Sequence, residues 1–395
     1  MLDWQIPPTW GLRKLGFLAP EESLLVVPKT QPERTFNYWG LDAISQGQFD
    51  EPQSNLVSGS SIASTCISFS NQHILYAKLR PYLNKVIVPT VDGIGTTEWI
   101  VLKPKPEFVD RYYLAYALRT QHFVDHITTS SAGARMPRAR KEILFDSEIP
   151  IPYPDDPTRS LETQGRIVAR LEALLAEVAS ARGLSRDIDN DINRIRKAAL
   201  QDIFGKPEIK GWSPNTLGNL VDNHDAKRVP VRKSDRKNQA QKQYPYYGAS
   251  GIIDQVEEYL FDGEYLLVSE DGANLVARTY PIAFIATGKF WVNNHAHILK
   301  AKEEIATNKF LAYAIEASDI SEFVTGMAQP KLNQTRMNEI PIWLPKTLQE
   351  QEKIVVHLEA IENEVEELKQ NQNDTTTLLG NLEQALLMQA FRGEL

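Results

Sequence analysis

The chain has almost no cysteine and no long apolar run. Its 395 residues include a single cysteine, Cys66. One cysteine excludes a disulfide framework and a cysteine-based zinc site, and it fits a reducing compartment. No stretch approaches the ~18 consecutive apolar residues that cross a bilayer, and residues 1–8 lack the basic and apolar segments of a signal peptide. We therefore expect a cytoplasmic, soluble protein with no membrane association.

Sequence motifs for phosphate and metal chemistry are also missing. Gly288-Lys289 lacks the upstream glycine and the following Ser or Thr of a phosphate-binding loop, which excludes an ATPase motor. His295 and His297 have no third ligand at metal-site spacing, so hydrogen bonding within the fold is favoured over zinc. Glu270-Asp271 precedes a glycine and is more typical of a turn than of a catalytic acid pair. We expect no catalytic residue, no metal and no cofactor.

Charge is distributed unevenly along the chain. The formal net charge is -8, which is unusual for a protein that holds nucleic acid. However, Lys227–Lys242 contains seven basic residues against one acid, and Glu350–Glu367 contains seven glutamates against one lysine. Because these stretches nearly cancel, the sum says little about either surface. The length of 395 residues predicts at least two domains.

The sequence contains an internal duplication. Several short patterns recur in the same order, and their separation decreases steadily along the chain, from 202 positions at the first pair to 187 at the last. A duplication with small deletions in the second copy explains this behaviour. The matched pairs are Trp10/Trp212, Leu102/Leu299, Leu114/Leu311, Pro137/Pro330, Ile149/Ile340 and Gln164/Gln351.

Each copy is predicted to contain a globular head followed by a long helix. Short apolar segments between Gly, Pro and Asn clusters, such as 74–79, 99–102 and 265–268, are typical of strands. Residues 112–118 and 310–315 have helical periodicity. The predicted fold class is α+β, with two pseudo-twofold-related heads separated by two antiparallel helices that form a coiled coil. The expected domains are 1–156 (first head), 157–206 (central helix), 207–346 (second head) and 347–395 (C-terminal helix).

The coiled coil is predicted from apolar residues at alternating spacings of four and three. They fall at 167, 171, 174, 178, 181, 188, 192, 195 and 199, and again at 354, 358, 361, 365, 368, 379, 382 and 386. A helix of roughly 43 residues is about 65 Å long at ~1.5 Å per residue. Such a stripe cannot be buried within one small domain, so packing of the two stripes against each other is favoured over two unrelated amphipathic helices.

Two similar heads on a helical spacer suit a ligand with two sites at fixed separation, and DNA repeats its faces every ~34–36 Å. A chain with this repeat and these helices resembles the specificity subunits of type I restriction–modification systems. The resemblance spans essentially the whole chain and includes the segments 79–83, 244–251, 269–274 and 287–297 and the helix ends 198–204 and 385–391.

The resemblance implies that each head reads one half of a bipartite target in double-stranded DNA. It also implies that the helices dock two adenine methyltransferase subunits, and that motor-nuclease subunits join for restriction. The sequence lacks the Asn/Asp-Pro-Pro-Tyr/Phe motif of an adenine methyltransferase; Ile151-Pro152-Tyr153 has no amide or acid to hold the target amine. The chain is therefore expected to be non-catalytic, and the pocket for a flipped base belongs to its partner.

Basic and amide residues in both heads are the predicted DNA contacts. Lys78 and Arg80 alternate along a predicted strand and would share one face. Residues 135–141 follow a turn that recurs at 326–331, and Lys227–Lys242 is predicted to be an exposed basic loop; a solvated polar loop is the alternative for any single residue. The candidates are Lys78, Arg80, Arg135, Arg138, Arg140, Lys141, Lys227, Arg228, Arg232, Lys233, Arg236, Lys289, Asn293, Asn294, Lys331, Gln334 and Arg336.

Partner docking is assigned to apolar residues near the start of each helix: Ile167, Leu171, Leu174, Ile354, Leu358 and Ile361. Three alternatives stay open. The chain could serve a related methylation-based defence system, act as a free-standing two-headed DNA-binding regulator, or be a fused methyltransferase, which the missing motifs disfavour. The sequence gives neither the bases read, the spacer length, which head reads which half-site, nor whether the complex restricts DNA or only methylates it.

Overall fold

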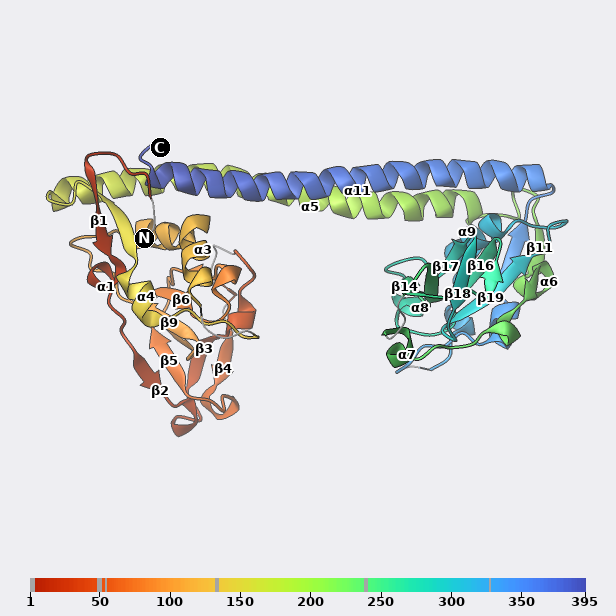
Figure 1. Ribbon diagram of the computed structural model, residues 1–395, viewed down its shortest axis with the longest axis horizontal. Helices are drawn as coiled ribbons and strands as arrows, with labels where there is room; N and C mark the ends of the chain where they lie inside the picture. Colours follow the sequence, from red (N-terminus) through yellow and green to blue (C-terminus); the bar gives the residue numbers. More distant parts are fainter. Residues whose placement is uncertain (1–3, 48–51, 54, 132–134, 238–240, 327) are drawn as a thin grey trace. The chain divides into compact units, whose positions relative to one another are not determined.

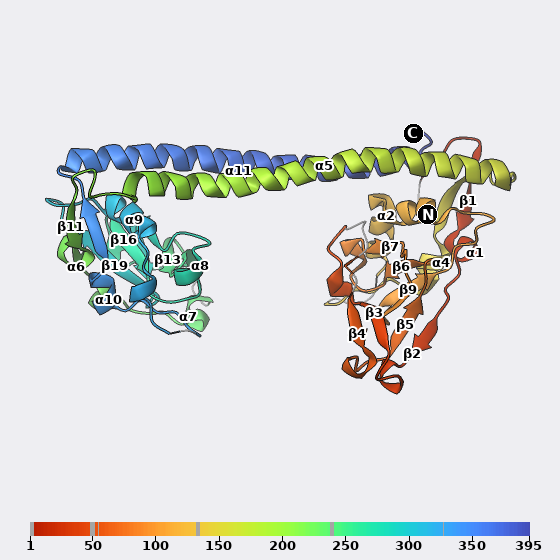
Figure 2. The ribbon, with the colours of Figure 1, turned by 180° about the vertical axis from the view of Figure 1, so that it is seen from behind.

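The computed structural model describes residues 4–47, 52–53, 55–131, 135–237, 241–326 and 328–395. Contacts divide the chain into two compact units, and each is described by itself: unit 1 comprises Met1–Ser185 and Asp374–Leu395, and unit 2 comprises Arg186–Asn373. Each unit therefore contains one head and parts of both long helices (Figures 1 and 2). Among the residues described, every helix is too short or too polar to span a lipid bilayer.

The first head in unit 1 is built from three small sheets. A five-stranded sheet has the order β2-β5-β8-β3-β4, a three-stranded sheet has the order β7-β6-β9, and β1 pairs with β10. The strands are β1 (Trp10–Lys14), β2 (Leu24–Val26), β3 (Thr35–Trp39), β4 (Leu56–Ser58), β5 (Cys66–Phe69), β6 (Ile74–Ala77), β7 (Val86–Ile87), β8 (Gly93–Thr96), β9 (Trp99–Leu102) and β10 (Glu148–Pro152).

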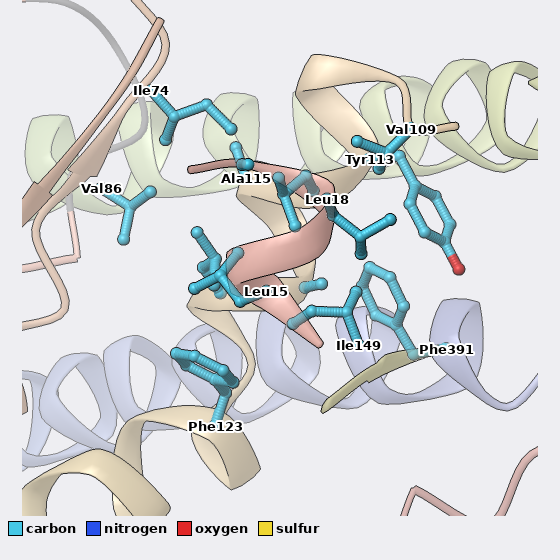
Figure 3. Close-up of a cluster of buried hydrophobic side chains, with 14 of the residues drawn as sticks. Leu15, Leu18, Ile74, Val86, Val109, Tyr113, Ala115, Phe123, Ile149 and Phe391 are labelled. Carbon is cyan, nitrogen blue, oxygen red and sulfur yellow. The ribbon is translucent and has the colours of Figure 1, made fainter. Parts of the chain in front are cut away.

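The core of unit 1 lies between these sheets and the helices. The short helices are α1 (Leu15–Leu18), α2 (Arg111–Arg119), α3 (Gln121–Thr129) and α4 (Lys141–Asp146). Figure 3 shows Leu15, Tyr113 and Ile149 around Phe391, which comes from the C-terminal end of α11 (Leu348–Phe391). The rings of Tyr113 and Phe391 are 4.9 Å apart. Residues distant in sequence therefore share one core.

The second head in unit 2 is built in the same manner. One four-stranded sheet has the order β12-β19-β16-β17, a second has the order β14-β13-β18-β15, and β11 pairs with β20. The strands are β11 (Ser213–Thr216), β12 (Val221–Asn223), β13 (Tyr244–Gly248), β14 (Gly251–Val256), β15 (Phe261–Asp262), β16 (Tyr265–Ser269), β17 (Ala283–Ala286), β18 (Lys289–Val292), β19 (Ala296–Ala301) and β20 (Pro341–Leu344). The short helices are α6 (Leu217–Leu220), α7 (Lys233–Lys237), α8 (Asn274–Ala277), α9 (Asn308–Ala317) and α10 (Gln334–Asn338).

Two long helices complete the units. Helix α5 spans Pro157–Phe204 and α11 spans Leu348–Phe391. In unit 1 the first part of α5 lies beside the last part of α11, with an ion pair of 2.6 Å between Arg182 and Glu383. In unit 2 the last part of α5 lies beside the first part of α11, with an ion pair of 3.1 Å between Arg196 and Glu362. The predicted fold class, with heads of mixed α and β structure and paired antiparallel helices, is confirmed.

The predicted coiled-coil seam is only partly correct. Ile167, Leu171, Val178 and Ile192 are buried, as expected. However, four of the predicted seam positions are exposed, and the polar Ser185 and Gln372 are buried. The reason is that an uninterrupted α-helix has 3.6 residues per turn and drifts away from a strict seven-residue repeat. The exposed positions are Ile188, Ile195, Leu368 and Leu382.

Equivalent glutamines attach each head to the start of its own long helix. Gln164 in α5 accepts a hydrogen bond from the backbone N–H of Asp110 (2.8 Å) and donates one to the carbonyl of Phe108 (3.1 Å). Gln351 in α11 accepts from Thr307 N–H (3.2 Å) and donates to Ile305 O (2.9 Å). Both glutamines are almost fully buried. These matching bonds show the duplication in the hydrogen bonding of the two heads.

Asp110 and Thr307 are also the N-cap residues of α2 and α9. The Asp110 side chain accepts from the backbone N–H of Tyr113, and that of Thr307 accepts from Phe310. Each glutamine therefore binds the backbone of a residue that begins a head helix. A head that rotated on its long helix would break this pair of buried hydrogen bonds.

Aromatic residues attach each head to the end of the other long helix. In unit 2, Phe204 at the end of α5 packs 5.7 Å from both Trp212 and Phe310. In unit 1, Phe391 at the end of α11 packs against Trp4 and Tyr113. Each head is thus held by the beginning of the helix of its own copy and by the end of the helix of the other copy.

We predict that Gln351→Ala destabilises the second head by about 1–3 kcal/mol, because it leaves two partly buried hydrogen-bonding groups of the backbone without partners. Urea unfolding followed by circular dichroism measures the loss. Gln349→Ala, at an exposed position in the same first turn of α11, is the control and should change stability by about 0.5 kcal/mol or less. Equal effects of the two substitutions would contradict a clamping role for Gln351.

Candidate nucleic-acid interface

In the first head, two chain segments cross just beyond the end of β6. Residues 78–80 leave the strand and pair with residues 137–139: Arg80 N–H donates to Pro137 O (2.7 Å), and Ala139 N–H donates to Lys78 O (2.8 Å). Leu79 and Arg138 form an isolated antiparallel bridge between them. We call residues 78–80 and 137–139 the first crossing.

The second head has the same arrangement beyond β16. Gly272 N–H donates to Pro330 O (3.0 Å), and Leu332 N–H donates to Glu270 O (2.8 Å), with a bridge between Asp271 and Lys331. We call residues 270–272 and 330–332 the second crossing. The hydrogen bonds align Lys78 with Glu270, Arg80 with Gly272 and Arg138 with Lys331. The predicted correspondence between residues 135–141 and the region around Lys331 is therefore confirmed in the backbone.

The first crossing carries mostly cationic side chains. Arg80, Arg135 and Arg140 are exposed, Lys78 is half-buried, and none of the four forms an ion pair with another described residue. Two further cations are paired: Arg138 with Glu98 at 3.0 Å, and Lys141 with Glu21 at 2.7 Å.

The argument that Lys78 and Arg80 share one strand face was wrong. Strand β6 ends at Ala77, and Arg80 has a left-handed backbone with φ 52°. The aligned residue in the second head is Gly272, with φ 112°. A positive φ suits glycine, whereas in another residue it costs on the order of 1–2 kcal/mol. The same turn thus uses glycine in one head and a strained arginine in the other.

The second crossing is built over a buried charged network. Arg228 is paired with Glu270 at 2.5 Å and with Asp225 at 3.5 Å, and His297 Nδ1 lies 2.6 Å from Asp225 Oδ2. Lys331 lies 3.2 Å from Glu270. Burial alone would raise the pKa of Asp225 and of Glu270, but the hydrogen bonds from His297 and Arg228 outweigh it, so both pKa values lie below the ordinary range. The network therefore holds ionised carboxylates.

His295 and His297 both hydrogen-bond within the second head, as predicted. His297 Nε2 lies 2.8 Å from the carbonyl of Leu332, which can only accept, so Nε2 carries a hydrogen. His295 Nδ1 lies 2.7 Å from Asp271 Oδ2. Among the described residues, no three His, Cys, Asp or Glu side chains form an arrangement that could hold a metal ion.

The expectation that Lys227–Lys242 forms an exposed basic loop was wrong for two of its arginines. The Arg228 and Arg236 side chains are only 16% and 12% exposed, and Arg236 binds Asp254 at 2.9 Å. Lys242 also binds Asp254. Lys227, Arg232 and Lys233 are exposed. Sequence reasoning overcounted the cations available to a ligand because it could not identify their acidic partners.

The remaining candidates differ in accessibility. Lys289 follows a turn at Gly288, as predicted, and lies 4.6 Å from the centre of the Tyr259 ring. Asn293 is buried and accepts a hydrogen bond from His295 N–H, whereas Asn294 is exposed. Gln334 is exposed in the first turn of α10, and Arg336 is exposed but paired with Glu339.

Five of the six apolar residues assigned to partner docking pack into or against the chain's own cores; Ile361 is the exception. Ile167 and Leu171 belong to the core of unit 1, and Leu358 belongs to the core of unit 2. Leu174, Ile354 and Ile361 are half-buried. Burial within the protein removes the first three as docking contacts. The exposed apolar residues of the long helices are different ones: Leu184, Ile188, Ile195, Val356, Leu368, Leu378 and Leu382.

Comparison with known proteins finds one family to which parts of this chain are similar. A sequence profile described as the type I restriction modification DNA specificity domain matches residues 209–375. A putative type I restriction enzyme specificity subunit of Haemophilus influenzae is 36% identical over 41% of this chain and 40% of its own length. The EcoprrI specificity subunit of Escherichia coli is 26% identical over 50% of this chain and 48% of its own length. The matches thus span less than half of these two relatives.

Longer matches support the same fold over the whole chain. The StySPI specificity subunit of Salmonella potsdam is 25% identical over 74% of this chain and 67% of its own length. A chain from a structural study of complex assembly and conformational transition of the type I R-M system has a TM-score of 0.78, with 23% identity over 100% of both chains. The HsdS subunit of Thermoanaerobacter tengcongensis has a TM-score of 0.52, with 23% identity over 99% of this chain and 98% of its own.

We predict that Arg228→Ala lowers the free energy of unfolding of the second head by about 3–5 kcal/mol, because it leaves buried carboxylates unpaired. Thermal and urea unfolding measure the effect. Arg232→Ala, four residues away and exposed, is the matched control, with an expected change of about 0.5 kcal/mol or less. If Arg228→Ala proved as mild as its control, the network would not stabilise the second head.

Proposed function

We propose that this chain is a type I restriction–modification specificity subunit and that it selects the DNA sites at which partner enzymes act. The observation that carries the proposal is the repeated unit: two heads with matching crossings, each attached by a buried glutamine to a long helix. A duplicated reader suits a target in double-stranded DNA that consists of two separated half-sites. Each head reads one half-site.

We propose that the exposed cations of the two heads hold the DNA backbone. In the first head these are Arg80, Arg135 and Arg140, with the half-buried Lys78 beside them, and in the second they are Lys227, Arg232, Lys233 and Lys289. Phosphate contacts fix the register, whereas base-edge contacts give sequence selectivity. The exposed amides Asn294 and Gln334 can both donate to and accept from base edges. The ion-paired Arg228 and Arg236 instead stabilise the second head.

The chemistry belongs to partner subunits in this proposal. The sequence lacks the motif with which an adenine methyltransferase holds its target amine, and the chain acts as a non-catalytic adaptor. Two adenine methyltransferase subunits bind the long helices through exposed apolar residues such as Leu184, Leu368 and Leu378. Motor-nuclease subunits join for restriction. We place this assembly in the cytoplasm, where the DNA of a bacterial cell lies.

A map of N6-methyladenine across a genome tests the proposal directly. Cells that carry the methyltransferase partner are compared with and without this gene. The expected result is a gene-dependent motif of two short blocks separated by a fixed gap. Methylation that is independent of the gene, or a continuous motif, contradicts the adaptor function and favours a free-standing regulator.

The long helices are proposed to set the gap between the half-sites. Insertion of seven residues into α5 after Ser185 and seven into α11 after Asn373 adds two helical turns, about 10 Å, to each helix. The methylated motif should keep both blocks and lengthen its gap by about three base pairs. Insertion into α5 alone is the control, and it should abolish methylation because the two helices lose their pairing. A double insertion that methylates with the original gap would exclude the helices as the spacer.

A further inference from the structure

We propose that Arg80 is a phosphate contact of the first head. Its backbone has a conformation that glycine would adopt more easily, and its side chain is exposed. The inference rests on the proposed function and goes further by explaining why the backbone at this one contact is strained. It also separates the two heads, since the second head has no cation at this position. Three observations carry it: the strained backbone, the free side chain and the charge of its neighbours.

The strained backbone is fixed by the crossing. Arg80 N–H donates to Pro137 O at 2.7 Å, and the flanking bridge joins Leu79 to Arg138. Release of the positive φ would break this pairing. The second head forms the same bond at Gly272, where positive φ brings no clash. Glycine therefore adopts a positive φ at this position without strain. An arginine at the same position lowers the stability of the head, and its structural role gives no reason for that loss. Strained residues of this kind concentrate at functional sites.

The Arg80 side chain is available to a ligand. It is exposed, and its guanidinium forms no ion pair or hydrogen bond with any other residue that the structure describes. Pro81, which follows it, is buried and begins a short 3-10 turn, so the chain directly after Arg80 is anchored. A side chain on an anchored turn loses less freedom on binding than one on a loose loop.

The neighbours of Arg80 favour an anion. Lys78 at the same crossing is cationic, and so are Arg135 and Arg140, which flank residues 137–139 in the chain. These three form no ion pair among the described residues, while Arg138 is balanced by Glu98. Burial lowers the pKa of the nearby Lys85. The negative charge of Asp42 raises this pKa, and the positive charge of Arg80 lowers it. Among the described residues, Glu98 is the one acid that forms an ion pair with a side chain of the first crossing, and it is taken by Arg138. Phosphate oxygens match an all-cationic set.

Arg80→Gly tests the inference in the complete complex with the methyltransferase partner. The melting temperature of the variant should equal or exceed that of the parent, because glycine relieves the positive φ. Affinity for target DNA should fall about tenfold near 0.15 M salt, and the slope of log affinity against log salt should become shallower by about one. The methylated motif should stay the same. Arg80→Lys, which keeps the charge, should retain most of the slope.

Each other outcome overturns the inference in a distinguishable way. A changed base in one half of the motif would make Arg80 a base reader. Unchanged affinity and slope would place Arg80 off the DNA, and a lower melting temperature would give the arginine a structural role. If the parent complex itself methylates no gene-dependent bipartite motif, the proposed function fails, whatever Arg80 does.

Discussion

The attachment of the heads depends on a small polar interaction between helix and head. Gln164 and Gln351 each make two hydrogen bonds to backbone groups of their head, from positions that water scarcely reaches. Apolar contacts between a helix and a globular surface tolerate sliding and rotation, because they have little directionality. A buried amide pair does not, since every misplaced donor and acceptor loses its partner. The glutamines therefore give each head a defined orientation on its helix.

On this common frame the two heads carry different charges. The crossings match bond for bond in the backbone, yet the first carries exposed cations and the second covers a balanced network of Arg228, Asp225, Glu270 and His297. The backbone is the conserved part of the duplication, and the side chains have diverged upon it. Such a separation allows a reader to acquire a new preference without loss of its fold.

The sequence predicted the features that depend on local pattern and on the repeat. Helices α2 and α9, strands β9 and β16 and the start of α5 at Pro157 follow from periodicity and from proline placement. The failures concern partners distant in sequence. Arg228 finds Glu270 and Arg236 finds Asp254 through the sheet, and no local signal marks these pairs. The left-handed backbone at Arg80 was missed for a different reason: the matching position of the second head is a glycine, Gly272, whereas nothing in the residue type at position 80 signals a positive φ.

The aromatic ends of the long helices have a consequence for the two copies in the chain. Phe204 belongs to the first copy but packs beside Phe310 in the core of the second. Phe391 belongs to the second copy but packs beside Tyr113 in the core of the first, so neither copy supplies every aromatic residue of its own core. A polypeptide of half this length would leave one phenylalanine without a pocket and one pocket without a phenylalanine. Two such polypeptides satisfy each other by reciprocal exchange. Because one chain carries both copies, the exchange of the two phenylalanines needs no second polypeptide, and each head can change its sequence without change in the other.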